Sequence, residues 1–213
     1  MAIHRTITDF KAALQGGGAR PNLFEVSIPT FPVAAGEDVW DTTLNINFNF
    51  LCKAAALPAS NVSPIEVPFR GRTLKVAGDR TFDTWTVTII NDENFAIRSA
   101  MESWMNGISK LDNASGATNP DSYMTDAFVY QLGRGASKGR HSTSNNGING
   151  TDAGVKPLRT YQFFDIFPTN VAQIDLSYDS TDTIEEYTVE FQVQYWQAGA
   201  DNDATDQTGS IIR

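Results

Sequence analysis

The side chains that could carry catalysis or bind a metal are few in this sequence of 213 residues. It contains one cysteine, Cys52, and two histidines, His4 and His141. A single cysteine excludes an internal disulfide and a multi-cysteine metal site. Because Cys52 ends an alternating segment with no histidine near it in sequence, we expect a small buried side chain rather than a nucleophile.

Two short segments are partly similar to ligand-binding loops. Gly133-Arg134-Gly135, followed by Lys138, has the glycines of a phosphate loop but lacks a G-K-S/T pair and a following helix. Residues 201–206 carry the spaced aspartates of a calcium loop, but Ile212 stands where the bidentate Glu belongs. We interpret them as an ordinary loop and a solvated acidic tail, and we expect no enzyme activity, no metal and no cofactor.

The overall charge narrows the range of partners. Sixteen Lys and Arg against 25 Asp and Glu give a formal net charge of -9, which argues against a protein that holds DNA or an anionic membrane by bulk charge. With 41% apolar residues the chain can bury a core. The start of the chain lacks a signal peptide and no apolar run is long enough for a membrane helix, so we expect a soluble protein made in a cytosol, with no membrane anchor.

Apolar and polar residues alternate along much of the chain, which is typical of half-buried strands. Arg70-Gly71-Arg72 lies between two such segments and predicts a hairpin. The fold class we expect is mainly β, an antiparallel β-sandwich or barrel of seven to nine strands. The expected strands lie at 23–28, 44–50, 65–69, 74–76, 85–89, 128–132, 174–178 and 187–195.

Helical periodicity occurs in two places. Thr6 and Asp9 have the spacing of a capping box, and residues 10, 13 and 14 share one face, so a short N-terminal helix is expected up to the glycines at 16–18. That helix is too short to be stable alone and should pack on the body or on a neighbour. Apolar residues at 97, 101, 104, 105 and 108 predict one internal helix.

Two segments have the composition of extensions rather than of packed structure. Residues 133–157 are rich in Gly, Ser and Asn and predict a mobile loop. Residues 197–213 predict an acidic C-terminal extension. We therefore expect one domain over residues 1–196, interrupted by the 133–157 loop.

Several exact strings resemble the tail tube proteins of contractile-tailed, T-even-like myovirus bacteriophages. None of them carries chemistry, but they follow one another in the family order over about residues 19 to 196. The chain departs from the family pattern at 32–43, at 133–157 and after Trp196, where it looks longer. The strings are 19–24, 52–54, 56–59, 76–83, 85–88, 91–93, 168–171 and 195–196.

The resemblance implies a structural protein of the virion tail. Such proteins form homohexameric rings whose strands join into one barrel, and the rings stack into a tube inside a contractile sheath. The implied partners are further copies of the chain, the tail sheath, the baseplate and the tail terminator proteins. Viral double-stranded DNA would pass through the lumen without specific binding during ejection into the host. Assembly in the bacterial host cytoplasm is implied as well.

A conduit for DNA needs a lumen without cations, since cations would bind the duplex phosphates. Three expected strands offer neutral or acidic faces, and for each of them an ordinary solvent face remains the alternative. The candidate lumen-facing residues are Asn45, Asn47, Asn49, Glu186, Glu190 and Gln192, beside the threonines at 84, 86 and 88.

Two further sites are expected at the outside of the subunit. Gly78 to Asp83 should form a turn, in which Asp79 and Asp83 flank Arg80 as carboxylate partners at a subunit interface. An exposed local pair of small energetic effect is the alternative. The basic residues of the 133–157 loop, Arg134, Lys138 and Arg140, are candidates for contact with the sheath.

Other functions are compatible with parts of this pattern. The first alternative is the tube protein of a phage-tail-like contractile injection system that carries protein cargo. A β-sandwich adhesion or sugar-binding module with exposed tryptophans is a second alternative, and an enzyme is the most distant one.

Overall fold

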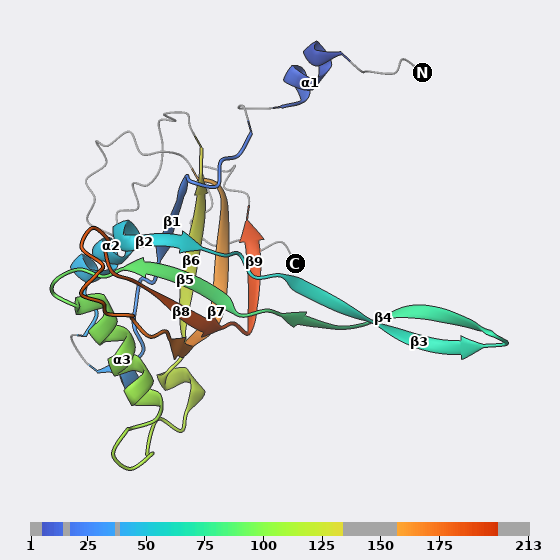
Figure 1. Cartoon of the computed structure of the whole chain (residues 1–213). Coiled ribbons are helices and arrows are strands. Elements are labelled where there is room, and N and C mark those ends of the chain that lie inside the picture. The colour runs from blue at the N-terminus through green and yellow to red at the C-terminus, as the bar shows by residue number, and fades with distance from the viewer. Residues whose placement is uncertain (1–5, 15–17, 37–38, 134–156, 200–213) are drawn as a thin grey trace, which may run out of the picture. The chain divides into compact units, whose positions relative to one another are not determined.

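The computed structural model describes residues 6–14, 18–36, 39–133 and 157–199 (Figure 1). The chain divides into two units. The larger comprises residues 26–127 and 162–196, and the smaller comprises residues 1–25, 128–161 and 197–213. In chain order the elements are α1 Ile7–Ala13, β1 Phe24–Ser27, η2 Val33–Ala35, α2 Thr42–Leu51, β2 Cys52–Ala55, β3 Ser60–Phe69, β4 Arg72–Phe82, β5 Trp85–Ile90, α3 Ala96–Ile108, η3 Pro120–Ser122, β6 Thr125–Leu132, β7 Pro157–Val171, β8 Glu186–Gln192 and β9 Tyr195–Gly199.

The strands form one larger and one smaller sheet. The larger has seven strands in the order β1-β6-β7-β8-β5-β2, with β9 also paired to β7. The smaller is the β3–β4 hairpin, whose strands pair only with each other among the described residues. The mainly β prediction is therefore confirmed, whereas the described residues show neither a second sheet packed as in a sandwich nor a barrel closed within one subunit.

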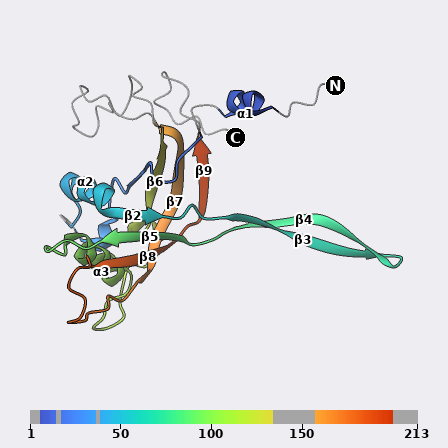
Figure 2. The same ribbon diagram turned by 45° about the horizontal axis from the view of Figure 1, so that its top comes forward.

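The core of the larger unit lies between one face of the sheet and α3. Alternation along β5 and β8 sends every second side chain inward, where Trp85 and Phe191 have no exposed surface. The rings of Trp85 and Phe163 stack with centroids 4.8 Å apart, and Trp104 of α3 lies 5.9 Å from Phe191. The Trp104 indole also donates a hydrogen bond of 2.7 Å to the Tyr123 carbonyl. Aromatic packing thus fixes α3 against the sheet (Figure 2).

Both predicted helices are present. The N-cap Thr6 and Asp9 form the expected capping box of α1, which buries none of its side chains. The internal helix spans Ala96–Ile108 and buries Ile97, Met101 and Trp104 on one face. None of the described helices combines the length and the apolar composition that a membrane crossing requires.

Two predicted strands are wrong. Residues 44–50 belong to the helix α2, which begins directly after its N-cap residue Asp41. The Asp41 carboxylate accepts a 2.7 Å hydrogen bond from the Leu44 backbone. Every second residue of this segment is apolar, but Leu44, Phe48 and Leu51 also have helical spacing, and the cap decides between the two interpretations. Residues 174–178 form part of the loop between β7 and β8, where Leu176 and Tyr178 are exposed and no neighbouring strand pairs with them.

The strands β7 and β9 were not expected in full. The 15-residue strand β7 has an irregular burial pattern, because Asp165 has a positive φ of 52° and the register to β8 shifts between Pro168 and Asn170. The predicted strand 187–195 is divided into β8 and β9. β9 reaches Gly199, so residues 197–199 continue a strand, while the rest of the predicted extension and most of the 133–157 loop lie outside the described residues.

A polar sheet face as candidate functional site

The candidate site is the face of β5 and β8 that points away from the core. Thr86 lies opposite Glu190 and Thr88 opposite Thr188 in the antiparallel register. Residues opposite each other in a sheet share one face. Their neighbours Trp85, Val87, Val189 and Phe191 are buried on the other face. The outward side chains are therefore mainly hydroxyls and carboxylates, with Ile90 opposite Glu186 as an apolar exception, and the inner side chains of the same strands are buried in the core.

Neighbouring strands extend this polar face. Asn170 of β7 lies opposite Glu190, and Ala54 of β2 lies opposite Thr88. We name the set the polar sheet face. It consists of Ala54, Thr86, Thr88, Asn170, Glu186, Thr188, Glu190 and Gln192.

Lys53 adjoins the polar sheet face, and its charge is paired. The Lys53 Nζ lies 2.5 Å from a carboxylate oxygen of Glu186, with 54% and 34% of the two side chains exposed. Such an exposed pair contributes at most about 1 kcal/mol to stability, but it offsets the lysine charge. Glu190 keeps its carboxylate at the centre of the face, where phosphate groups would be repelled rather than bound.

The predicted lumen residues do not all reach this face. Glu186, Glu190 and Gln192 alternate along β8 as expected. Asn45, Asn47 and Asn49 lie on α2 instead of a strand. Asn45 is only 7% exposed, and its amide oxygen accepts a 3.2 Å hydrogen bond from the Ile28 backbone. Burial removes Asn45 from the candidate channel-lining side chains.

Asn170 and Lys53 were missed by the sequence reasoning. Asn170 follows the register shift of β7, so strict alternation gives no indication of its face. Lys53 belongs to β2, where the register to β5 is irregular between Cys52 and Ala54.

The segment from Gly78 to Asp83 is not the predicted turn. Residues 78–82 belong to β4, with Arg80 opposite Val62 and Thr81 opposite Asn61. Gly78 has no positive φ. Instead, a Cβ at this position would lie 2.6 Å from the Ser63 carbonyl oxygen, so the glycine permits close approach where the β3–β4 register shifts.

The predicted carboxylate pair around Arg80 is also absent. Within the described ranges no ion pair joins Arg80 to Asp79 or Asp83. Asp83 accepts a 3.0 Å hydrogen bond from the Asn61 amide. Adjacent residues of an extended strand point to opposite faces, which separates Asp79 from Arg80. The basic residues Arg134, Lys138 and Arg140 lie outside the described residues.

Cys52 has the buried environment that the sequence predicts. Its side chain is 7% exposed, and burial raises the pKa of the thiol from its ordinary value of 9.0 to about 12. The thiol also lies 3.7 Å from the Ala54 carbonyl oxygen, to which it donates a hydrogen bond. A backbone hydrogen bond of Ala54 to the sulfur opposes the upward shift of the pKa, but less strongly than burial raises it. Across the part of the chain that the structure describes, no three His, Cys, Asp or Glu side chains are grouped as they would be around a metal ion.

The larger sheet thus ends at β1 and β2, carries β9 as a further strand on β7, and presents one mainly polar face. The sequence profile of the family described as "Phage tail tube protein" matches residues 19–199. The chain belongs to the phage tail tube protein family.

Curated relatives agree with this assignment. The chain is 34% identical over 192 residues to "Tail tube protein gp19" of Enterobacteria phage T4, covering 90% of this chain and 99% of the relative. It is 26% identical over 200 residues to "Tail tube protein" of Serratia phage KSP90, covering 92% and 97%.

Solved structures share the fold at low sequence identity. A chain of the sheath-tube complex of the extracellular contractile injection system PVC, in the extended state, has a TM-score of 0.52 at 14% identity, covering 92% of this chain and 99% of that one. A chain of the anti-feeding prophage baseplate has a TM-score of 0.55 at 10% identity, covering 87% and 98%. This likeness concerns the fold alone.

Proposed function

We propose that this tail tube protein forms hexameric rings that stack into the inner tube of a contractile phage tail. The observation that carries the proposal is the family match over residues 19–199. The tube would contact the sheath, the baseplate and the tail terminator, would be assembled in the host cytoplasm and would conduct double-stranded DNA. Support for these partners comes from chains of similar fold in a sheath-tube complex and in a six-fold symmetrised baseplate.

Closing a ring would pair the edge strands that the sheet of a single subunit leaves exposed. The strand order ends at β1 on one side and at β2 on the other. Exposed edges invite pairing with other chains, and pairing of unlike edges between neighbours repeats around a ring. We propose that the six sheets join in this way into one barrel.

The polar sheet face is the surface that suits the lumen of that barrel. It presents Thr86, Thr88, Thr188 and Glu190 from strands held by the aromatic core. Hydroxyl and carboxylate groups give duplex phosphates no cation to bind, so DNA would slide without stalling. Glu186 and Gln192 extend the same face along β8, and Lys53 is neutralised by Glu186.

Electron microscopy of the purified full chain, alone and with its baseplate, tests this function. We expect hollow tubes of six-fold rings whose inner wall carries the polar sheet face. A chain that stays monomeric in both conditions and at high protein concentration would contradict the proposal, as would rings with α3 on the inner wall.

Asp79, Arg80 and Asp83 remain our candidates for a subunit interface near the base of the hairpin. Arg80 has no carboxylate partner within the described part of its own subunit, so its charge is available to a neighbour. We predict that Arg80→Ala leaves the melting temperature of the free subunit nearly unchanged, because an exposed side chain contributes little. Tube assembly should weaken, as seen by light scattering and microscopy. If the variant forms normal tubes, or if its free subunit unfolds, Arg80 has only an ordinary structural role and no role at an interface.

A further inference from the structure

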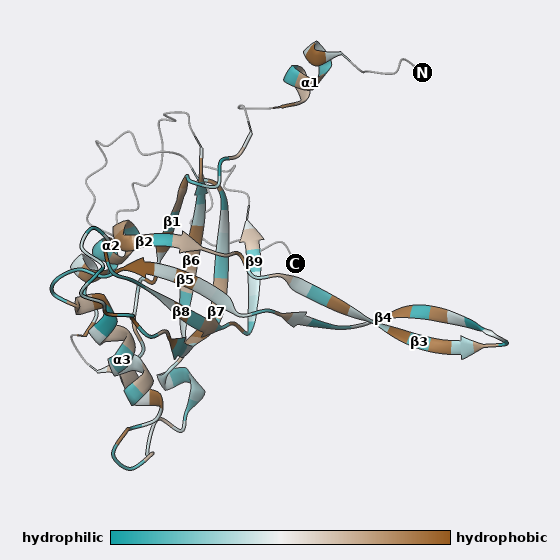
Figure 3. Ribbon diagram, viewed as in Figure 1, coloured by the Kyte–Doolittle hydropathy of each residue, from teal (hydrophilic) through white to brown (hydrophobic). Residues whose placement is uncertain are grey.

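The β3–β4 hairpin has two chemically different faces. Ile65 lies opposite Val76 and Val67 opposite Leu74, so these residues share a face with Phe69. All five side chains are exposed, between 44% and 66%. We name this surface the apolar hairpin face. It consists of Ile65, Val67, Phe69, Leu74 and Val76, and Figure 3 shows hydrophobic segments along both strands.

On the opposite face of the hairpin, the charged side chains already pair with each other. Glu66 lies opposite Lys75, and their charged atoms are 3.7 Å apart. Pro64 and Pro68 lie on the same face and remove two backbone donors from β3. A two-stranded hairpin is at best marginally stable alone in water. A contiguous apolar surface on it therefore marks a contact with another molecule.

The charge around the apolar hairpin face restricts the partner. Residues 60–82 carry four basic and two acidic side chains, a net of +2 within a chain of net charge -9. Two of the arginines, Arg70 and Arg72, stand at the tip, and the Arg70 guanidinium lies 5.5 Å from the centre of the Phe69 ring. The best partner is an apolar surface with acidic surroundings.

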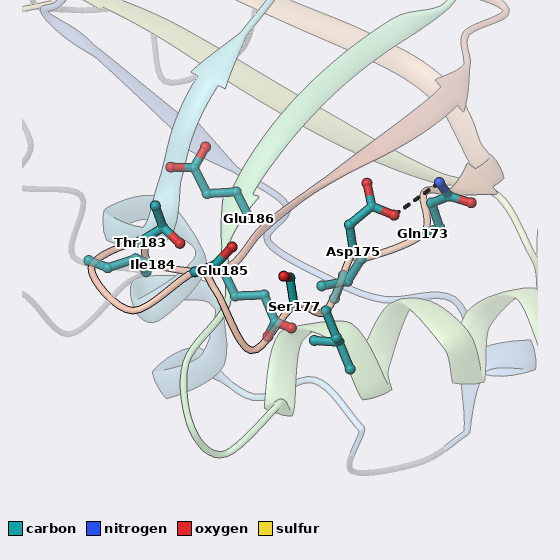
Figure 4. A pocket seen from close by; sticks show the side chains of 10 residues that line it. Gln173, Asp175, Ser177, Thr183, Ile184, Glu185 and Glu186 are labelled. Atoms are coloured by element: carbon teal, nitrogen blue, oxygen red, sulfur yellow. Dashed lines mark hydrogen bonds between the residues drawn. The ribbon is translucent and has the colours of Figure 1, made fainter.

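This chain carries such a surface in the loop of residues 172–185. Leu176, Tyr178 and Ile184 are 85%, 105% and 72% exposed. Around them stand four carboxylates and no Lys or Arg, at positions 175, 179, 182 and 185. The loop surrounds a hollow of about 310 Å³, and Figure 4 shows Asp175, Ile184 and Glu185 among the side chains that line it. We name this segment the acidic loop.

The two surfaces lie at opposite ends of the sheet of the larger unit. The hairpin leads into β5 at Trp85, whereas the acidic loop leads into β8 at Glu186. Glu186 lies opposite Ile90, at the far end of β5. The intervening strand is about 17 Å long at 3.3 Å per residue. One subunit therefore does not join its own hairpin to its own acidic loop.

We propose that the apolar hairpin face of one subunit docks on the acidic loop of a second copy of the same chain. Leu176, Tyr178 and Ile184 cover the apolar residues, and the carboxylates of the loop meet Arg70 and Arg72. A contact between two unlike surfaces repeats from subunit to subunit and builds a ring or a filament. The inference deepens the proposed tube and rests on it, because it names which parts of adjacent subunits meet.

Site-directed cross-linking tests the pairing directly. The full chain with Val67→Cys and Tyr178→Cys is treated with a short bismaleimide, and we expect a ladder of trimers and higher species on denaturing gels. A mixture of the two single variants should stop at dimers, which also controls for the buried Cys52. Leu74→Cys replaces Val67→Cys if that variant does not fold.

Three cross-linking outcomes overturn the pairing. The first is visible tubes without a ladder. The second is cross-linking of the Val67→Cys thiol to Phe10→Cys of α1, in a variant that carries this cysteine instead of Tyr178→Cys. The third is cross-linking of two hairpins to each other.

Charge reversal supplies an independent readout. Arg70→Glu with Arg72→Glu should raise the protein concentration for half-assembly at least about tenfold. Adding Asp179→Lys and Asp182→Lys to the same chain should restore it to within about threefold, because the pairing is reversed but intact. The matched control, Glu66→Lys with Lys75→Glu, keeps the ion pair on the other face and should assemble normally. Absence of rescue contradicts the pairing.

The two proposals fail in different ways. If the unmodified chain forms no tubes but the double cysteine variant still gives the ladder, the tube function fails and the pairing stands. If tubes form and neither the ladder nor the rescue is seen, only the pairing fails.

Discussion

At the scale of single residues, Asn45 shows how a polar side chain fixes a helix. Its amide oxygen accepts from the Ile28 backbone, and its amide nitrogen donates to the Ser27 hydroxyl at 3.3 Å. We predict that Asn45→Leu lowers the free energy of unfolding by about 2–3 kcal/mol, because it leaves buried partners without hydrogen bonds. Urea unfolding measures this.

The exposed residue Asn47, on the same helix, provides the control for Asn45. Asn47→Ala should change stability by less than about 0.5 kcal/mol. Equal losses in both variants would mean that helix propensity rather than the buried amide decides the effect.

Cys52 gives a prediction on pH. With a thiol pKa of about 12, the folded chain at pH 8 holds about one thiolate in ten thousand, so labelling by a disulfide reagent should be slow until urea unfolds the protein. Folding favours the neutral thiol. Its contribution to stability is therefore complete below pH 9 and is lost as the pH rises toward 12.

Cys52→Ala should accordingly show a shallower loss of stability between pH 9 and 12 than the parent chain. Denaturant titrations at several pH values measure the slope. Fast labelling of the folded chain at pH 8 would contradict the buried position of the thiol.

At the scale of elements, α3 approaches the backbone of η2 through a glycine. A Cβ at Gly107 would lie 1.8 Å from the Ala34 carbonyl oxygen, which is rigid backbone. We predict that Gly107→Ala destabilises the subunit by about 3 kcal/mol despite the better helix propensity of alanine, because α3 must move away from η2. Thermal unfolding of the free subunit tests this.

Glu102 of the same helix provides the comparison for Gly107. It is exposed and pairs with Arg98 four residues earlier at 2.8 Å. Glu102→Ala should cost no more than about 0.5 kcal/mol. A stabilised Gly107→Ala variant would show that α3 and η2 are not packed closely.

At the scale of the whole molecule, the proposed conduit predicts an effect of charge on DNA passage. Thr88 lies on the polar sheet face, between Ala54 and Thr188. Thr88→Lys would add six cations to every ring of the proposed hexamer. We predict slower genome ejection that recovers in high salt, because added cations bind phosphates with a strong salt dependence. Ejection rates of single virions measure this.

Thr88→Gln separates charge from size. It enlarges the side chain without a charge, so ejection should remain close to normal at every salt concentration. Equal rates for Thr88→Lys and the parent at low salt would remove the polar sheet face from the lumen.

The sequence by itself determined those elements whose apolar spacing fits either a strand or a helix, but not both. Alternation in β5 and β8 and helical spacing in α3 each allow one arrangement that buries the apolar residues. The capping box of α1 and the hairpin around Gly71 depend on neighbouring residues only, and both were predicted. The shared face of Glu186, Glu190 and Gln192 followed from the same alternation along β8.

Only the tertiary structure decided the features that depend on distant partners. The segment 44–50 fits both periods, and α2 forms because Asp41 caps it and Asn45 meets Ile28. Residues 174–178 alternate without a neighbouring strand, and a strand needs backbone partners that local sequence does not supply. The separation of the apolar hairpin face from the acidic loop is likewise a consequence of topology, since both follow from the pairing of β5 with β8.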